Sequence, residues 1–337
     1  MIKNKKILFA VLNWGLGHAT RSIPLINELI KNNNEIILAS DGQALDLLQK
    51  EFPKLQFEKL PAYNIHYSSN KYLFLIDLVF QTPKIIKAIR NEHQKTKELV
   101  SKYNIDYIIS DNRYGVYQKD VYSVFMTHQL RVLSGLTTWF STKIQKKLIK
   151  SNEIWIPDFE GDDNLSGKLS HNVKIDKKTI YLGVLSRFKY KEVPKQYDIL
   201  AILSGVEPQR SLLEKILLRE FQKSDKKIGL VQGVVENEQK LKNINGIDIY
   251  NYLLSDEMEN LINASEIIIS RSGYTSIMDY CVLKKKVFFI PTPGQTEQIY
   301  LAKYLDDKSV APYCFQQDFE LRQLNRINDY KGLEANP

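Results

Sequence analysis

The chain contains the stretch SRSGYTSIMD at residues 270–279, and the fold prediction starts from it. The apolar residues 267–269 before it predict a buried parallel strand, and residues 275–283 predict a helix. Ser272 and Gly273 therefore fall on a strand-to-helix turn. The first N–H groups of a helix lack partners within the helix and lie at the positive end of its dipole. We expect this turn to bind a phosphate group.

The residues that follow add groups suited to a nucleotide sugar. Thr275 opens the predicted helix, and Asp279, about one turn further along, could accept hydrogen bonds from two ribose hydroxyls. A strand expected at residues 286–290 leads into the stretch PTPGQTEQ at residues 291–298. The arrangement predicts a nucleotide-sugar site. The last loop would supply three more polar side chains, Gln295, Glu297 and Gln298.

Length and composition set limits on the kind of protein. The chain has 337 residues, of which 43% are hydrophobic and 26% charged, so two globular domains are expected. Two cysteines form no disulfide framework, which fits a reducing compartment. The apolar residues 7–12 are too few for a signal peptide, and no segment approaches the roughly 20 apolar residues of a membrane span. We expect a cytoplasmic protein, with peripheral contact at the inner face of the plasma membrane as an open alternative.

The net charge of +8 favours anionic partners such as nucleotide diphosphates or anionic lipid headgroups. No zinc-finger, RNA-recognition or helix-turn-helix pattern accompanies the lysines, so no nucleic-acid partner is expected. The lysines could equally be a general property of the surface.

Apolar strands alternate with helical stretches along the whole chain, which predicts an α/β fold with two doubly wound parallel sheets. We expect one domain at residues 1–188 and a second at residues 189–337, with their ligands at the carboxyl ends of the strands. In the first domain, strands are expected at residues 7–13, 35–40, 107–110, 122–127, 153–157 and 179–182, and helices at 20–31, 44–51, 84–102 and 136–149. In the second, strands are expected at 197–203, 227–231, 248–250, 267–269 and 286–290, and helices at 209–222, 256–264, 275–283 and after Gln295.

The first strand runs into the stretch NWGLGHATRS at residues 13–22. Gly15 and Gly17 allow a tight turn, and His18 would then stand at the start of a helix. An imidazole near a helix N-terminus tends to stay neutral, as a general base must. Alternatively, the glycines only shape the turn and His18 caps the helix.

A dinucleotide-binding fingerprint is another explanation of the same turn. Gly15 and Gly17 follow a strand, and Asp41 ends the next strand at a suitable distance. The third glycine of that fingerprint is absent, because Thr20 occupies its position. The partial pattern is weak evidence for a nicotinamide enzyme.

Two further polar clusters end apolar strands in the first half. They are SDNR at residues 110–113 and THQ at residues 127–129. Asp111 is a second candidate catalytic residue, and His128 could contact an acceptor. Either side chain could instead cap a helix or satisfy loop amides.

The motifs at residues 15–22, 270–279 and 291–298 together resemble the GT-B glycosyltransferases of family 28. That family includes the N-acetylglucosaminyltransferase of lipid II synthesis and less characterised archaeal and bacterial relatives. The resemblance implies two Rossmann-like domains facing each other across a cleft, the first on the acceptor side and the second binding the nucleotide sugar. It also implies inverting transfer, with a UDP-sugar as donor. No Asp-x-Asp motif is present, so no metal and no cofactor are expected.

The resemblance implies a role for each matching residue. His18 would deprotonate the acceptor, Gly15 and Gly17 would face the donor diphosphate, and Ser272 and Gly273 would bind phosphate. Asp279 replaces the family's ribose-binding glutamate and reaches one methylene less far. The remaining donor-binding residues would be Gln298 at the sugar, Gln295 and Glu297 beside it, Arg187 in a Gly-x-x-x-Arg spacing, Ser204 and Gly205 in the donor loop, and Arg210 at the phosphates.

Residues 72–80 are apolar with one charge, and Lys84, Lys87 and Arg90 follow. Such a segment could rest on an anionic membrane, which would favour a lipid-linked acceptor, or it could be a buried helix. Two other functions remain open: a UDP-sugar hydrolase or epimerase of the same fold, and a non-catalytic GT-B subunit that binds nucleotide.

Overall fold

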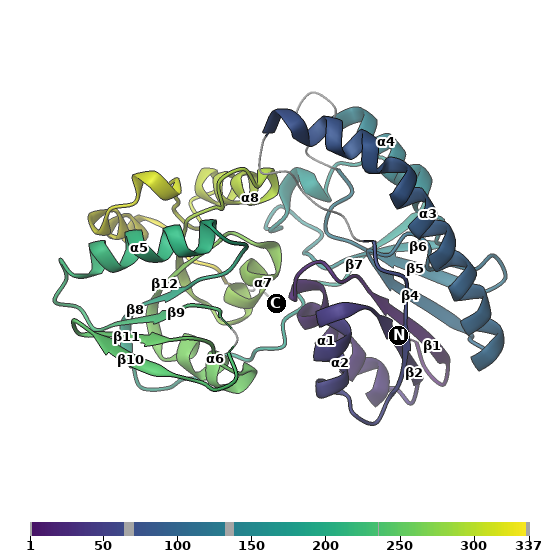
Figure 1. Cartoon of the computed structure of the whole chain (residues 1–337), viewed down its shortest axis with the longest axis horizontal. Helices are drawn as coiled ribbons and strands as arrows, with labels where there is room; N and C mark the ends of the chain where they lie inside the picture. Colours follow the sequence, from purple (N-terminus) through teal and green to yellow (C-terminus); the bar gives the residue numbers. More distant parts are fainter. Residues whose placement is uncertain (1, 64–70, 132–137, 235, 335–337) are drawn as a thin grey trace. The chain divides into compact units, whose positions relative to one another are not determined.

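The computed structural model describes residues 2–63, 71–131, 138–234 and 236–334, and the side chains of these residues except 71–82 and 138–141. The chain divides into two compact units, Met1–Arg187 and Phe188–Pro337. Each unit contains its own sheet, flanked by helices (Figure 1). The predicted α/β class with two Rossmann-like domains is confirmed.

The first unit is built on a seven-stranded sheet in the order β3-β2-β1-β4-β5-β6-β7, with all neighbours parallel. Its strands are β1 (Lys6–Val11), β2 (Glu35–Ser40), β3 (Gln56–Lys59), β4 (Tyr107–Asp111), β5 (Tyr122–Met126), β6 (Glu153–Ile156) and β7 (Lys178–Tyr181). Its helices are α1 (Gly17–Lys31), α2 (Gly42–Glu51), α3 (Lys71–Tyr103) and α4 (Thr138–Leu148), with a short 3₁₀ helix η2 (Gly167–Leu169).

Both faces of this sheet are covered, which explains why its central strands are apolar at successive positions. Ile7 and Phe9 of β1 belong to a core cluster that also holds Ile26 of α1. Leu8, on the opposite face of the same strand, belongs to a second cluster with Leu99 of α3. In Figure 1, α1 and α2 accordingly lie on one side of the sheet and α3 on the other.

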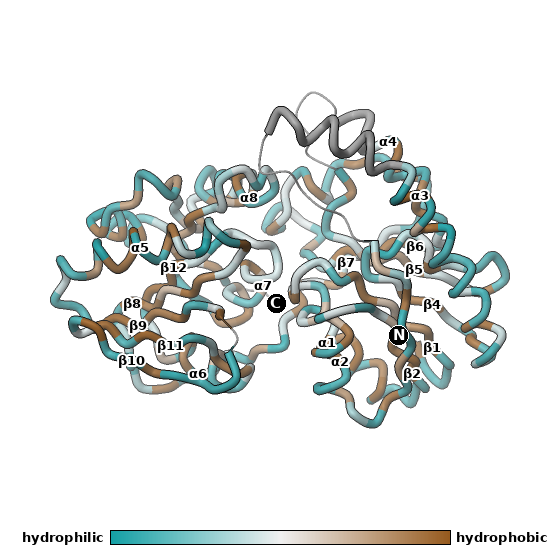
Figure 2. Tube along the Cα trace, viewed as in Figure 1, coloured by the Kyte–Doolittle hydropathy of each residue, from teal (hydrophilic) through white to brown (hydrophobic). Residues whose placement is uncertain are grey.

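The second unit has a six-stranded sheet in the order β10-β11-β9-β8-β12-β13, parallel except for the β10–β11 pair. Its strands are β8 (Tyr197–Ile202), β9 (Ile228–Val231), β10 (Leu241–Ile244), β11 (Ile247–Tyr250), β12 (Ser265–Ser270) and β13 (Lys286–Phe289). Its helices are α5 (Gln209–Phe221), α6 (Ser255–Asn263), α7 (Tyr274–Val282) and α8 (Thr296–Asp307), with 3₁₀ helices η3 (Gln316–Asp318) and η4 (Leu321–Asp329). Figure 2 shows hydrophobic residues concentrated on the strands of both sheets.

The observed elements differ from the expected ones in three places. β3 and β10 were not predicted, and α3 begins at Lys71 instead of residue 84. Pro83 lies inside α3, where the sequence suggested a helix start, because proline is common in the first turn of a helix. All four residues of β10 are exposed and lack an apolar pattern, but β10 forms a hairpin with β11 across Asn245 and Gly246, both at positive φ.

The apolar segment at residues 72–80 is part of helix α3, and its side chains lie outside the described residues. The predicted membrane contact therefore stays a prediction. Within the described part of the chain, no helix combines the length and apolar character needed to cross a bilayer.

The strand order reverses at one point in each sheet. In the first unit it reverses between β1 and β4, and in the second between β8 and β12. Loops that leave the carboxyl ends of such neighbouring strands diverge and leave room for a ligand. His18, Asp111, Ser204 and Ser272, expected from the sequence as site residues, lie at the ends of these strands or shortly after them.

Candidate active site

The turn between β1 and α1 presents His18 at the start of a helix. Gly15 has a φ of +66°, a left-handed conformation that glycine adopts without strain. Gly17 is the first residue of α1 and His18 the second. The predicted local geometry is therefore present.

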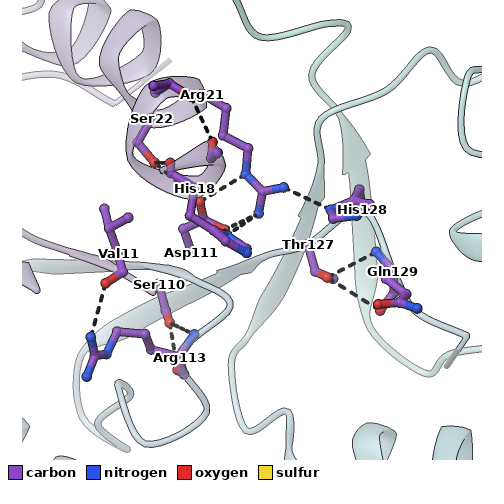
Figure 3. A network of polar contacts seen from close by, with 12 residues as sticks. Val11, His18, Arg21, Ser22, Ser110, Asp111, Arg113, Thr127, His128 and Gln129 are labelled. Carbon is purple, nitrogen blue, oxygen red and sulfur yellow. Dashed lines mark hydrogen bonds and ion pairs between the residues drawn. The ribbon is translucent and has the colours of Figure 1, made fainter. Parts of the chain in front are cut away.

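The His18 ring contacts Asp111, the last residue of β4 (Figure 3). His18 Nδ1 lies 3.0 Å from Asp111 Oδ1, and the Asp111 side chain is completely buried. An ionised carboxylate can only accept hydrogen bonds, so this contact favours the His18 tautomer with its proton on Nδ1. The candidate catalytic residues His18 and Asp111 thus form a hydrogen-bonded pair.

Arg21 also belongs to this site, although no sequence pattern assigned it a role. Its buried guanidinium donates from Nε to Asp111 Oδ2 at 3.0 Å and from Nη2 to Asp111 Oδ1. Its Nη1 lies 2.8 Å from Nδ1 of His128, which follows β5. Arg21 comes three residues after His18 on one helix, a spacing that places two side chains on the same face. This spacing is the sequence feature that could have indicated a contact between Arg21 and the His18 site.

The surroundings of the pair shift both protonation equilibria. Burial lowers the pKa of His18 from its ordinary 6.5, Arg21 lowers it further, and Asp111 acts in the opposite direction. Burial alone would raise the pKa of Asp111, but Arg21 and His18 outweigh it and hold that pKa well below its usual value. From the sequence, a neutral His18 was expected because of the helix dipole; in the structure, burial and Arg21 are the main causes that lower its pKa.

A second buried network shapes the same edge of the sheet. Arg113 is fully buried and donates to Glu92, to Asp41 Oδ1 at 2.7 Å and to the Val11 carbonyl at 3.1 Å. Asn13 donates to the other Asp41 oxygen at 3.3 Å. The Asp41 carboxylate is therefore engaged inside the protein, which argues against the ribose contact that a dinucleotide fingerprint would need.

In the second unit, the turn after β12 has the expected geometry. Gly273 is the N-cap of α7, so the helix begins at Tyr274, one residue before the expected start. Ser272 Oγ donates its proton to the carbonyl of Gln298 at 2.8 Å. A phosphate at this turn would therefore be bound by the backbone amides and not by that hydroxyl.

The loops after β8 and β13 lie beside this turn. Gln298 Oε1 accepts a hydrogen bond from the Thr292 backbone at 2.8 Å, which leaves its NH₂ group as the part able to contact a ligand. A Cβ atom on Gly205 would lie 3.8 Å from Thr292 Oγ1, so Ser204 and Gly205 adjoin the β13 loop. The structure thus brings together the three donor loops expected from the sequence.

Arg271 connects these loops by hydrogen bonds. No sequence pattern predicted that it would do so. Arg271 is 1% exposed, and its guanidinium donates to the carbonyls of Ile290, Pro291 and Gln209 and to Gln316 Oε1, at 2.6–3.2 Å. Among the described residues, its Nε has no hydrogen-bond partner and no carboxylate pairs with the guanidinium. Burial lowers the pKa of Arg271 to about 10, so the side chain is charged at neutral pH.

The other predicted donor residues are placed as follows. Arg210 is paired with Glu207 and with Glu214, the latter at 3.0 Å, so carboxylates already compensate its charge. Arg187 is the last residue of the first unit. Thr275 and Asp279 are the second and sixth residues of α7, Gln295 is the N-cap of α8, and Glu297 lies in its first turn. Among the described residues, no group of three or more His, Cys, Asp or Glu side chains is arranged to hold a metal ion.

Two family models match the two units. Residues 199–328 match the glycosyltransferase family 28 C-terminal domain, and residues 5–134 match glycosyl transferase family 1. The protein is a glycosyltransferase with the GT-B fold, and its second unit matches the family 28 C-terminal domain.

Individual relatives agree with this assignment. The glycosyltransferase is 26% identical over 159 residues to the UDP-N-acetylglucosamine–N-acetylmuramyl-(pentapeptide) pyrophosphoryl-undecaprenol N-acetylglucosamine transferase of Sulfurihydrogenibium sp.; this alignment covers 44% of the chain and 45% of the relative. It is 23% identical to an uncharacterized glycosyltransferase of Methanosarcina mazei, over 90% of the chain and 84% of the relative. Its fold is similar to the crystal structure of the glycotransferase of kitacinnamycin, with a TM-score of 0.69, 10% identity, and coverage of 98% and 90%.

Proposed function

We propose that this glycosyltransferase moves a sugar from a nucleotide-diphosphate sugar, in particular a UDP-sugar, to an acceptor hydroxyl, with inversion and without a metal ion. The observation that carries the proposal is the His18–Asp111 pair at the carboxyl edge of the first sheet. The UDP-sugar class is supported by the relative whose name specifies UDP-N-acetylglucosamine.

His18 is the proposed general base. With its proton on Nδ1, the lone pair of Nε2 can accept a proton, and Nε2 has no hydrogen-bond partner among the described residues. The His18 side chain keeps 12% of its surface exposed. Nε2 removes the proton of the acceptor hydroxyl while the oxygen attacks the anomeric carbon. The bond from that carbon to the diphosphate breaks, and its electron pair leaves with the nucleotide. Such proton transfer typically contributes about 10²- to 10⁴-fold in rate.

The second unit is the proposed donor-binding unit. The amides at the start of α7 would bind the diphosphate and stabilise the charge that develops on it as it leaves. Asp279 would accept hydrogen bonds from the ribose, and the Gln298 NH₂ group would donate to a sugar hydroxyl. Arg271 adds a positive charge that no carboxylate of the described residues neutralises.

A thermal-shift comparison tests the donor class first. UDP should stabilise the full chain more than ADP, GDP or NAD at equal concentration, since a ligand of the native state raises its melting temperature. Equal shifts for all four would contradict the UDP assignment.

Product analysis then tests the reaction. A UDP-sugar incubated with candidate acceptors should give a glycoside of inverted anomeric configuration by NMR, with unchanged yield in EDTA. Free sugar or an isomer formed without acceptor would instead indicate a hydrolase or an epimerase. His18→Ala should lower kcat about 10²- to 10⁴-fold while the UDP-induced thermal shift persists. Turnover of this variant at the wild-type rate would exclude His18 as the base.

A lipid-linked acceptor is proposed as well, with the protein acting at the cytoplasmic face of a membrane. Lys84, Lys87 and Arg90 are exposed on α3 at three-residue intervals, and Ile86 between them is 41% exposed. Cations beside apolar residues suit an anionic lipid surface. The wild type should sediment with anionic liposomes and Leu75→Glu should not; equal sedimentation would remove this part of the proposal.

A further inference from the structure

Arg21 lies between two imidazoles and contacts both of them (Figure 3). Its Nη1 is 2.8 Å from Nδ1 of His128, and its Nη2 is 2.9 Å from Nδ1 of His18. The same guanidinium holds both oxygens of Asp111. All four side chains are buried or nearly so, with at most 12% of the His18 side chain exposed.

The chemistry of these contacts gives each ring a different tautomer. A guanidinium can only donate, so Nδ1 of His128 must accept, and the proton of that ring is on Nε2. Asp111 can only accept, so Nδ1 of His18 carries the proton. Arg21 Nη2 also lies 2.9 Å from His18 Nδ1 and donates to Asp111 Oδ1; we infer that the ionised carboxylate, the stronger acceptor, sets the His18 tautomer.

We propose that Arg21 is a positioning residue of the transfer reaction: by engaging Asp111 and His128, it keeps His18 uncharged with a free Nε2 and fixes His128 with a proton on Nε2. The inference rests on the proposed role of His18 as the base. It adds that the usual histidine–carboxylate pair is modified here by a third, cationic partner.

The charges around His18 explain why this matters. A lone carboxylate beside a histidine stabilises the imidazolium and would leave the base protonated near neutral pH. Here burial is the largest cause of the lowered pKa of His18; Arg21 on the same helix and His128 after β5 lower it further, and Asp111 at the end of β4 raises it. Arg21 thus offsets the effect of Asp111 on the His18 pKa, so that Asp111 orients the imidazole while the imidazole stays neutral.

The wild-type protein provides the first test, and it needs no substitution. Long-range ¹H–¹⁵N NMR of the histidine-labelled full chain distinguishes protonated from unprotonated ring nitrogens. The chain has five histidines, and His18→Gln and His128→Gln would assign the two relevant sets of signals. At neutral pH we expect Nδ1–H on His18 and Nε2–H on His128. The same tautomer on both rings would overturn the proposal.

Substitution of Arg21 provides the second test. Arg21→Gln should move the titration of His18 up by about one pH unit or more, because Asp111 then acts without the cation. Arg21→Lys keeps the charge and should restore most of the wild-type titration. In an Asp111→Asn background, Arg21→Gln should still raise the titration, because the Arg21 cation acts on His18 directly. Arg322→Gln, at an exposed arginine, is the matched control and should leave the titration unchanged. Identical titration of His18 in wild type and Arg21→Gln would contradict the role given to Arg21.

Kinetics separate this inference from the proposed function. If His18 is the base, the acid limb of kcat/KM should move to higher pH in Arg21→Gln together with the NMR titration. If the titration moves and the acid limb does not, Arg21 controls His18 as inferred but His18 is not the base. If the titration does not move, the inference about Arg21 fails whatever the activity. Should Arg21→Gln not fold, the wild-type tautomers and Arg21→Lys still decide the question.

Discussion

His18 Nδ1 and Asp111 Oδ1 lie 3.0 Å apart, although 93 positions separate the two residues in the chain. The proximity follows from the parallel pairing of β1 with β4, which places Val11 opposite Asp111. The Leu12 amide also donates to the Asp111 carbonyl at 3.0 Å, so the first residue after β1 is attached to the same strand end. The sheet therefore places Asp111 beside the start of the turn that carries His18.

Asp111→Asn should lower both activity and stability. The amide keeps the shape of the carboxylate but leaves the buried Arg21 without its anion, and breaking a buried ion pair costs about 3–5 kcal/mol. The rate should fall by up to about 10⁴-fold, because Asn cannot hold the His18 proton in the same way. Urea denaturation and steady-state kinetics would measure the two effects. Asp46→Asn, at an exposed position on α2, is the control; equal stability of both variants would contradict the buried ion pair.

Gly273→Ala tests the phosphate-binding turn by adding a single methyl group. Gly273 has a φ of −71°, and its added Cβ would meet nothing closer than Ser276 Oγ at 3.9 Å, so the free protein should fold normally. A diphosphate bound at the amides would meet the methyl, and we expect the Kd for UDP to rise at least about tenfold, or about 1.4 kcal/mol. Calorimetry measures it. Gly161→Ala, where a Cβ also meets nothing, is the control, and unchanged UDP affinity in Gly273→Ala would place the phosphate elsewhere.

Gln298→Glu separates the two functions of the Gln298 amide. The carboxylate can still accept the hydrogen bond from the Thr292 backbone, so the loop should keep its conformation and the protein its melting temperature. The donor NH₂ group is lost, and the donor KM should rise about 10- to 100-fold, the effect of losing a hydrogen bond of about 1–3 kcal/mol. Gln298→Ala should impair stability as well as KM. A normal KM in Gln298→Glu would show that this amide does not contact the sugar.

His18 makes stability depend on pH in a defined direction. The pKa of His18 is lower in the folded protein than its ordinary 6.5, so below about pH 6.5 the unfolded chain binds a proton that the folded chain does not. The free energy of unfolding should therefore fall as the pH drops from about 7 to about 5. Asp111, whose pKa is also lowered, adds a loss only at more acidic pH, below about 4. Urea denaturation at both pH values should show a smaller decrease for His18→Gln than for the wild type; an equal decrease would contradict the shift.

The sequence predicted most of the fold because its strands are apolar and its helices amphipathic. The turns after β1 and β12 could be located because glycine and small polar residues stand directly between such elements. The hairpin of β10 and β11 was missed because the four residues of β10 are all exposed. The start of α3 was missed because a proline such as Pro83 is typical of the first turn of a helix, whereas Pro83 lies within α3.

The site was only partly predictable for a different reason. His18 and Asp111 stand out because polar residues at strand ends are conspicuous. Arg21 and Arg271 are not, since an arginine in a helix or after a strand is usually exposed and carries no pattern of its own. Their contacts connect segments far apart in the chain, Arg21 to Asp111 across 90 positions and Arg271 to Gln316 across 45. Only the assembled sheets reveal them.

Arg271 gives the second unit a positive charge that no acidic side chain of the described residues neutralises. Burial of this cation among carbonyl groups, with no acidic partner in the described residues, destabilises the protein without nucleotide. Binding of a diphosphate would reduce that free-energy cost. The nucleoside diphosphate product carries the same diphosphate group as the donor, so the same electrostatic attraction would strengthen its binding. We therefore expect product inhibition that weakens as salt rises, with departure of the nucleotide limiting turnover at low ionic strength.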